Sequence, residues 1–82
     1  MAFRGYVLIE AEVGHAKGVG EAILELQHHD ARITAVDTVT GPYDVIVKAS
    51  AENVDQLGKL VVARIQSIEG ITRTLTCPIV HL

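Results

Sequence analysis

The same strand–helix–strand pattern occurs twice in this chain, once in each half, and this repeat limits the fold more than any other feature. The first half opens with a β-branched and aliphatic stretch at residues 6–12, which predicts a strand. Residues 15–28 have the spacing of a helix, and the expected apolar stripe consists of Ala16, Val19, Ile23 and Leu26, widened by Ala22 and Leu24. Residues 32–40 return to a strand pattern, whose expected single face consists of Ile33, Ala35, Asp37 and Val39.

The second half repeats this order after a Gly-Pro turn at residues 41–42. Residues 43–49 predict a strand that forms a hairpin with the preceding one. A second helix is expected to begin at Asn53, because Gln56 three residues later completes a capping-box pattern, and to stop at Gly70. Its expected buried stripe consists of Val54, Leu57, Val61, Ile65 and Ile68, with Asp55, Lys59 and Arg64 facing water.

The last strand is expected over residues 71–80, where Pro78 favours a sheet edge or a bend because it has no N–H to donate. Right-handed crossovers then give a four-stranded antiparallel sheet of order 4-1-3-2 with both helices on one face. This is an α+β fold of the ferredoxin-like βαββαβ type, and residues 1–82 are expected to form one domain.

The first strand is apolar on both of its faces. Val7, Ile9 and Ala11 alternate with Tyr6 and Leu8, whereas a sheet face open to water usually shows cleaner alternation with polar residues. We therefore expect a second copy of the chain to cover the open face, as in a dimeric α/β-barrel-like assembly.

Composition supports association and excludes several functions. The chain has 82 residues, a mass of 8.8 kDa, a mean hydropathy of +0.32 and a single cysteine, so no internal disulfide can reinforce its small core. The formal net charge is −3 and no basic cluster occurs, which argues against direct binding of DNA or RNA. No apolar run reaches about 18 residues and no signal peptide precedes the first strand, so no membrane association is expected and the expected location is the cytoplasm.

Catalytic and metal-binding patterns are weak. The four histidines show no spacing typical of paired metal ligands; they are His15, His28, His29 and His81. The glycine-rich stretch lacks the final glycine of a phosphate loop; its glycines are Gly14, Gly18 and Gly20. Packing of helix against sheet explains Gly18 and Gly20 more simply, and a structural thiol explains Cys77. We therefore expect no catalytic residue, no metal and no cofactor.

Two segments remain as candidates for binding. The hairpin tip at residues 40–44 offers backbone N–H groups, an aromatic ring and the Asp44 carboxylate, although an ordinary turn explains it equally well. The last strand carries Thr72, Thr74 and Thr76, which strand alternation places on one face, although threonine is also simply a good strand former. Because the third and fourth strands run in the same direction, Asp44 and Thr72 should lie at one end of the sheet, about 10 Å apart across the first strand. Asp44 could hold an ammonium group there, with turn N–H groups on a carboxylate.

Residues 40–76, from the TGPYD tip through the I-x-x-I-x-G helix end to the T-R-T-x-T strand, closely resemble the effector-binding (RAM) domain of the Lrp/AsnC transcriptional regulators. The first strand and helix fit the same domain. The resemblance implies a ferredoxin-like subunit that dimerises through its sheets and often assembles into octamers. It also implies that an amino acid or similar small effector binds near Gly41, Tyr43 and Asp44, and less securely near Thr72, Thr74 and Thr76.

Full-length members of that family also carry a helix-turn-helix domain, which these 82 residues lack. The resemblance therefore implies either a stand-alone module or a fragment, of which we expect the former, without its own DNA-binding activity. Such a module would regulate transcription or metabolism by association, including co-assembly with full-length relatives. The alternative is a small dimeric ferredoxin-like enzyme resembling monooxygenases or isomerases. That alternative needs pocket acids, bases or aromatic residues, and the chain has no Trp, one Phe and two Tyr.

Overall fold

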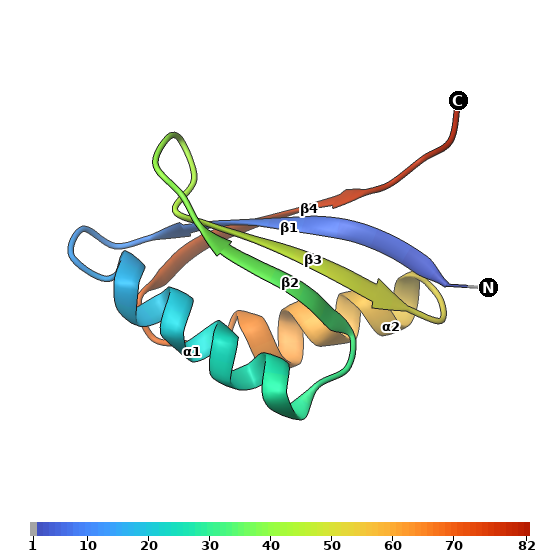
Figure 1. Ribbon diagram of the computed structural model, residues 1–82, viewed down its shortest axis with the longest axis horizontal. Helices are drawn as coiled ribbons and strands as arrows, with labels where there is room; N and C mark the ends of the chain where they lie inside the picture. The colour runs from blue at the N-terminus through green and yellow to red at the C-terminus, as the bar shows by residue number, and fades with distance from the viewer. Residues whose placement is uncertain (1) are drawn as a thin grey trace.

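The structure is a computed structural model that describes residues 2–82. Its elements, in chain order, are β1 (Phe3–Ala11), α1 (Ala16–His29), β2 (Ile33–Thr38), β3 (Val45–Ala51), α2 (Val54–Lys59), the π-helix η1 (Leu60–Ile65) and β4 (Ile71–Pro78). Figure 1 shows the sheet as one layer, with both helical segments packed beneath it.

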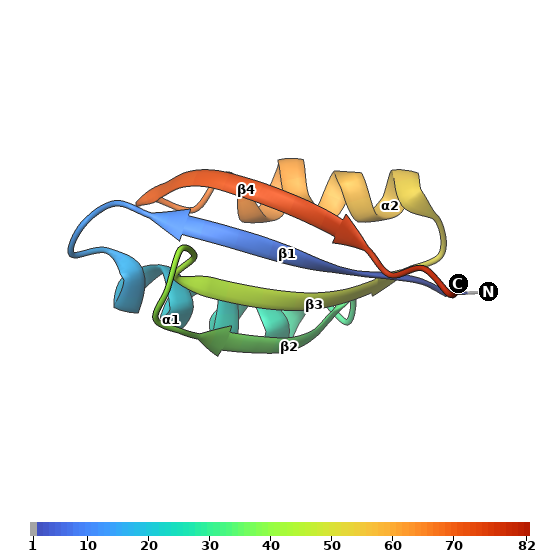
Figure 2. The ribbon, with the colours of Figure 1, turned by 90° about the horizontal axis from the view of Figure 1, so that it is seen from above.

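The four strands form one antiparallel sheet of order β2-β3-β1-β4, which is the predicted order 4-1-3-2 counted from the other edge. Figure 2, seen from above, shows the strands in this order over the two helices. The ferredoxin-like βαββαβ fold predicted from the sequence is confirmed. β4 lies at an edge and ends at Pro78, where the missing N–H costs no ladder hydrogen bond.

The core fills the space between the sheet and the helices. Its most deeply buried side chains come from both layers, namely Val7, Ile9, Val19, Ile23, Val45, Val47, Leu57, Leu60 and Ile65. In α1 the predicted stripe holds at Val19 and Ile23, but Leu24 is 46% exposed, so it does not widen the buried face. Gly20 meets Thr38 so closely that an added Cβ would overlap its hydroxyl, whereas Gly18 has open space around it. Close packing therefore explains Gly20 and not Gly18.

A β-bulge in β2 corrects the predicted face assignment. Ile33 pairs with Ala49, but Ala35 pairs with Lys48, so two residues of β2 advance against one of β3. The extra residue moves Ala35 to the open face of the sheet. Ala35 and Asp37 therefore share the open face, but the expectation that Ile33 lies on the same face was wrong. Alternation along one strand cannot reveal an extra residue whose position depends on pairing with the neighbouring strand.

The second helix begins as predicted and then departs from α-helical geometry. The Asn53 side chain accepts the Gln56 N–H at 2.9 Å, which caps the first turn. From Leu60 onward the chain is π-helical, and the Gln66 N–H reaches back to the Val61 carbonyl at 2.8 Å. The wider turn ends the helix before the predicted stop, so Gly70, with φ of +95°, lies in the turn that leads into β4.

The changed helix also alters which side chains are buried. Val54 is 58% exposed, so it does not belong to the buried stripe as predicted, while Leu60 is fully buried. Leu57 and Ile65 are buried as expected.

The face of the sheet away from the helices carries an apolar row across three strands. Leu8 on β1 pairs with Ile46 on β3 and with Leu75 on β4, and paired residues point to the same side. Leu75 is 39% exposed and the neighbouring Tyr6 is 40% exposed, with the Lys48 ammonium group 5.9 Å from the centre of the Tyr6 ring. We call Ile46, Leu8 and Leu75 the apolar row.

Candidate functional site

The loop that joins β2 to β3, residues 39–44, projects from the sheet on the side away from the helices (Figure 1). Gly41 has φ of +140°, a conformation that side chains other than hydrogen rarely adopt, so the glycine shapes the tip. The Val39 N–H donates to the Asp44 carbonyl at 2.8 Å and closes the base of the loop. β3 begins at Val45, two residues later than predicted, so Tyr43 and Asp44 belong to this loop and not to the strand.

Asp44 joins this loop to the end of β1. Its N–H donates to the Ile9 carbonyl at 2.9 Å, which continues the β1–β3 pairing by one step. Its carboxylate Oδ2 accepts the Ala11 N–H at 2.8 Å. The pairing of β1 with β3 ends at Ile9 and Val45, so this N–H has no strand partner on that side and is satisfied by a side chain.

Thr72 lies on the other side of the same strand end. Its hydroxyl donates to the Glu10 carbonyl at 3.2 Å, while Asp44 accepts from Ala11 one residue further on. β1 therefore separates Asp44 and Thr72 at one end of the sheet, as the sequence predicted. The bulge at Thr72 takes this residue out of the regular alternation of β4.

Thr74 and Thr76 do not join Asp44. They pair with Ile9 and Val7, whose side chains are fully buried under the helices, so both threonines point to the helix side of the edge strand. The Gln66 side-chain amide donates to the Thr74 hydroxyl at 2.8 Å. The six proposed residues thus divide into Gly41, Tyr43, Asp44 and Thr72 around the end of β1, and Thr74 with Thr76 beneath the sheet.

Chemically, the β1 end offers a carboxylate that is held in place but only partly engaged. Within residues 2–82, one oxygen of Asp44 accepts the Ala11 N–H and no described group donates to the other. The side chain is half-buried, so a cation that approached the free oxygen would be partly shielded from water. Across β1, Arg73 lies 3.8 Å from the Glu10 carboxylate on the open face.

Three contributors to this end of the sheet escaped the sequence analysis. The Ala11 N–H and the Glu10 carbonyl take part through the backbone, and no side-chain pattern signals them. Gln66 reaches Thr74 only because η1 ends there in a π-turn. No signal in the sequence identifies such a turn.

No group of three or more His, Cys, Asp or Glu side chains in residues 2–82 is placed to hold a metal ion. None of the described helices has the length and apolarity to cross a bilayer.

Comparison with known proteins places this arrangement in a family. Residues 5–81 match the family model of the Lrp/AsnC ligand binding domain. A stretch of 41 residues is 34% identical to an uncharacterised HTH-type transcriptional regulator of Pyrococcus furiosus, covering 50% of this chain and 27% of that protein. The chain thus matches little more than a quarter of the length of this curated relative.

Two solved structures share the fold over nearly the whole chain. The protein TTHA0845 from Thermus thermophilus superposes with a TM-score of 0.84 at 31% identity, covering 98% of this chain and 95% of that one. A transcriptional regulator of Neisseria meningitidis, solved as a complex with L-Met, superposes with a TM-score of 0.79 at 11% identity, covering 96% of this chain and 50% of that one. Together with the family match over residues 5–81, these likenesses establish that the chain belongs to the family of Lrp/AsnC ligand-binding domains.

Proposed function

We propose that this domain binds a small effector, of the amino acid class, at the end of β1 and acts as an oligomerising module of Lrp/AsnC-type regulation in the cytoplasm. The observation that carries this proposal is the half-engaged Asp44 carboxylate, held against β1 by the Ala11 N–H at 2.8 Å. An amino acid presents an ammonium group, which needs an anionic or multiply accepting partner. The Neisseria relative in complex with L-Met supports the choice of ligand class.

Self-association through the open face of the sheet is the second part of the proposal. The apolar row leaves Leu75 39% exposed and lies beside Tyr6, which is 40% exposed. Pairing of two such faces about a twofold axis would remove this apolar surface from water. The hairpin loop of residues 39–44 projects on the same side of the sheet, so a partner subunit seated there would stand next to this loop (Figure 1). We further propose that dimers can assemble into octamers and with full-length relatives.

The alternative, a small dimeric enzyme, draws no support from the described residues. Such an enzyme would need a pocket with acids, bases or aromatic residues between sheet and helices. That space is filled by aliphatic side chains such as Val7, Ile23, Val47 and Leu60, each with no exposed surface. Direct binding of nucleic acid by these 82 residues is not expected either, given the net charge of −3.

A thermal-shift screen against the twenty amino acids tests the effector proposal. Ligand at one hundred times its Kd adds about 2.7 kcal/mol of stability, which raises the Tm of a domain this size by roughly 10–20 °C. We expect one amino acid, or a few of similar shape, to produce such a saturable shift. A Tm that none of the twenty changes would contradict the proposal, whatever the oligomeric state.

A further inference from the structure

A shallow hollow of ≈ 510 Å³ lies on the outer side of the second helix, where α2 passes into η1. All of its lining residues are exposed; they are Val54, Asp55, Gly58, Lys59, Val62 and Ala63. Val54 is 58% exposed and Val62 is 66% exposed, so two valines of one helix face water on either side of this hollow. An exposed apolar surface with charged neighbours is typical of a contact with another protein.

Gly58 lies between the two valines, four residues from each, so the three residues follow one side of the helix. A Cβ added at Gly58 would meet no atom within 4 Å, and its φ is not positive. Neither packing within the chain nor backbone geometry requires this glycine, although glycine destabilises a helix relative to alanine. A bare backbone between two exposed valines lets a helix of another molecule approach closely. We call Val54, Gly58 and Val62 the outer row.

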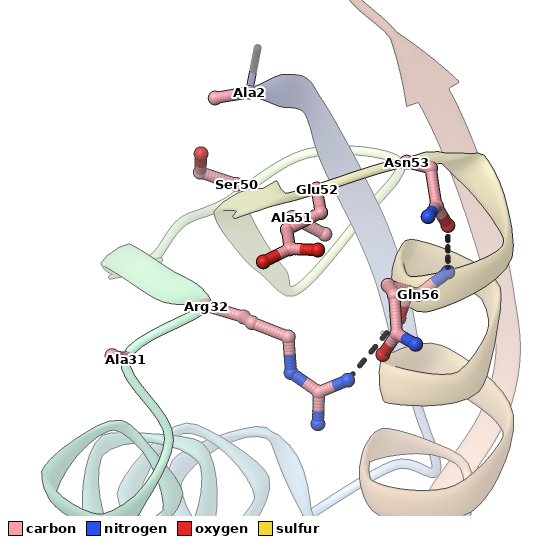
Figure 3. A pocket seen from close by; sticks show the side chains of 8 residues that line it. All are labelled: Ala2, Ala31, Arg32, Ser50, Ala51, Glu52, Asn53 and Gln56. Carbon is pink, nitrogen blue, oxygen red and sulfur yellow. Dashed lines mark hydrogen bonds between the residues drawn. The ribbon is translucent and has the colours of Figure 1, made fainter.

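The helix that carries the outer row is fixed to the body of the domain. The Asn53 side chain accepts the Gln56 N–H at 2.9 Å, and Arg32 Nη1 donates to the Gln56 carbonyl at 3.2 Å (Figure 3). On the inner side of the helix, Leu57 and Leu60 are buried in the core. A surface that is already held in place loses little conformational entropy when it associates.

We propose that the outer row packs against the outer row of a second copy of the chain, antiparallel and about a twofold axis at Gly58. Val54 then contacts Val62 of the partner subunit, and the reverse, because both lie four residues from the axis. The two glycines meet at the crossing point, where the absence of side chains allows the helices to come close together.

Charge complementarity favours a second copy as the occupant. Asp55 and Lys59 lie four residues apart on one flank of the outer row, and within residues 2–82 neither takes part in an ion pair. A twofold axis at Gly58 turns this flank toward its own copy. Along the helix axis, Asp55 then lies about 3 Å from Lys59 of the partner subunit. Two symmetry-related ion pairs at the surface would fix the orientation and the choice of partner more than the affinity.

This inference rests on the proposed sheet-to-sheet dimer, which the outer row would join to further dimers. Roughly two helical turns cover less than the about 800 Å² per partner of a standard interface, so two isolated monomers should not stay paired through this contact. A sheet-to-sheet dimer carries two outer rows, and contacts repeated within a closed assembly strengthen one another. Loss of the sheet contact should therefore give monomers, whereas loss of the helix contact should leave dimers.

Sedimentation velocity of the full chain and two glycine variants tests the proposal. We expect the parent chain to form an assembly larger than a dimer. Gly58→Leu places a side chain at the crossing point and should leave only dimers, whereas Gly18→Leu, a matched change at an open glycine of α1, should leave the assembly unchanged. A parent chain no larger than a dimer, or an assembly that Gly58→Leu does not reduce, would overturn the proposal. In either case, a dimer that Leu8→Glu dissociates would show that the proposed sheet contact still stands.

Asp55→Lys and Lys59→Asp test the charge arrangement. Each variant alone sets like charges against each other across the axis and should sediment as dimers, with an unchanged circular dichroism spectrum. An equimolar mixture should form the larger assembly again, because one chain then carries two positive charges on this flank and the other chain carries two negative charges. No change within a single chain produces such recovery. A mixture that stays dimeric would overturn the antiparallel pairing at Gly58.

Discussion

The Asp44 carboxylate accepts the Ala11 N–H at 2.8 Å and so ties the β2–β3 hairpin loop to the last residue of β1. The two residues are 33 positions apart in the chain, and the bond satisfies a backbone group that has no strand partner, because the pairing of β1 with β3 ends at Ile9. Asp44 therefore has a structural task, which uses one carboxylate oxygen, alongside the ligand-binding task proposed for it. The two tasks make different demands on the side chain and can be separated by substitution.

Asp44→Ala should lower the free energy of unfolding by about 1–2 kcal/mol, because it leaves the half-buried Ala11 N–H without an acceptor. Asp44→Asn should cost less than about 0.5 kcal/mol, since its amide oxygen can accept the same hydrogen bond. Urea denaturation of both variants checks this. Equal stability of Asp44→Ala and the parent chain would show that the Ala11 bond contributes nothing.

Leu8→Glu should dissociate the chain into 8.8 kDa monomers while the circular dichroism spectrum stays that of the folded protein. A carboxylate in the centre of the apolar row would have to be desolvated in the proposed sheet-to-sheet dimer, whereas it faces water in the monomer. Val62→Glu is the matched control, because Val62 is 66% exposed on η1, away from the open face. Sedimentation velocity distinguishes the two, and a dimer that survives Leu8→Glu but not Val62→Glu would place the interface on the helix side.

The Asp30–Arg32 pair should make stability depend on pH in acid. The side-chain hydrogen bond from Arg32 holds the pKa of Asp30 below its ordinary value of 3.8, although burial opposes the shift. A carboxyl whose pKa is lower in the folded than in the unfolded state takes up its proton at a higher pH in the unfolded chain, so lowering the pH favours unfolding. Its stabilising contribution is therefore complete above about pH 4–5 and is lost as pH falls through the folded-state pKa.

Asp30→Asn should remove that part of the acid dependence and cost about 2–3 kcal/mol at pH 7, because Arg32 and Arg64 lose their shared carboxylate. Glu21→Gln, at an exposed position of α1, is the control and should leave both quantities unchanged. Urea denaturation from pH 7 to pH 2 measures them. An acid dependence in Asp30→Asn as steep as in the parent chain would assign it to other carboxylates.

The sequence predicts those features of the fold that depend on residues close together in the chain. Alternation in β1, the burial of Val19 and Ile23, and the Asn53 cap depend on residues within a few positions of each other, and all are present in the structure. The bulges beside Ala35 and Thr72 depend on which residues pair across the sheet, so alternation assigned wrong faces or neighbours there.

The same limit applies to the candidate site. Turn chemistry identified the loop at Gly41 and Asp44, and topology placed Thr72 at the same end of the sheet. The π-turn that brings Gln66 to Thr74, and the hydrogen bond from the Arg32 guanidinium to the Gln56 carbonyl at 3.2 Å, are tertiary arrangements. Neither has a spacing pattern in the sequence.

Two glycines of α1 offer a test of the packing of helix on sheet. Gly18→Ala should stabilise the domain by about 0.5–1 kcal/mol, because the site is open and alanine restricts the unfolded chain. Gly20→Ala should instead destabilise it by about 1–2 kcal/mol, because the new methyl group meets the Thr38 hydroxyl. Adding Thr38→Ala to Gly20→Ala should restore most of the loss in thermal denaturation. A Gly20→Ala variant as stabilised as Gly18→Ala would contradict this close contact.

The central claim is that the Asp44 carboxylate holds the ammonium group of an amino acid effector, and calorimetric titration of Asp44→Asn tests it most directly. The variant keeps the acceptor for Ala11 but loses the negative charge, so its fold and oligomeric state should persist. With the amino acid that stabilises the parent chain best, we predict a tenfold or greater loss of affinity, corresponding to about 1.4 kcal/mol or more. Unchanged affinity in Asp44→Asn, at unchanged oligomer size, would show that Asp44 serves the loop alone and would contradict the account.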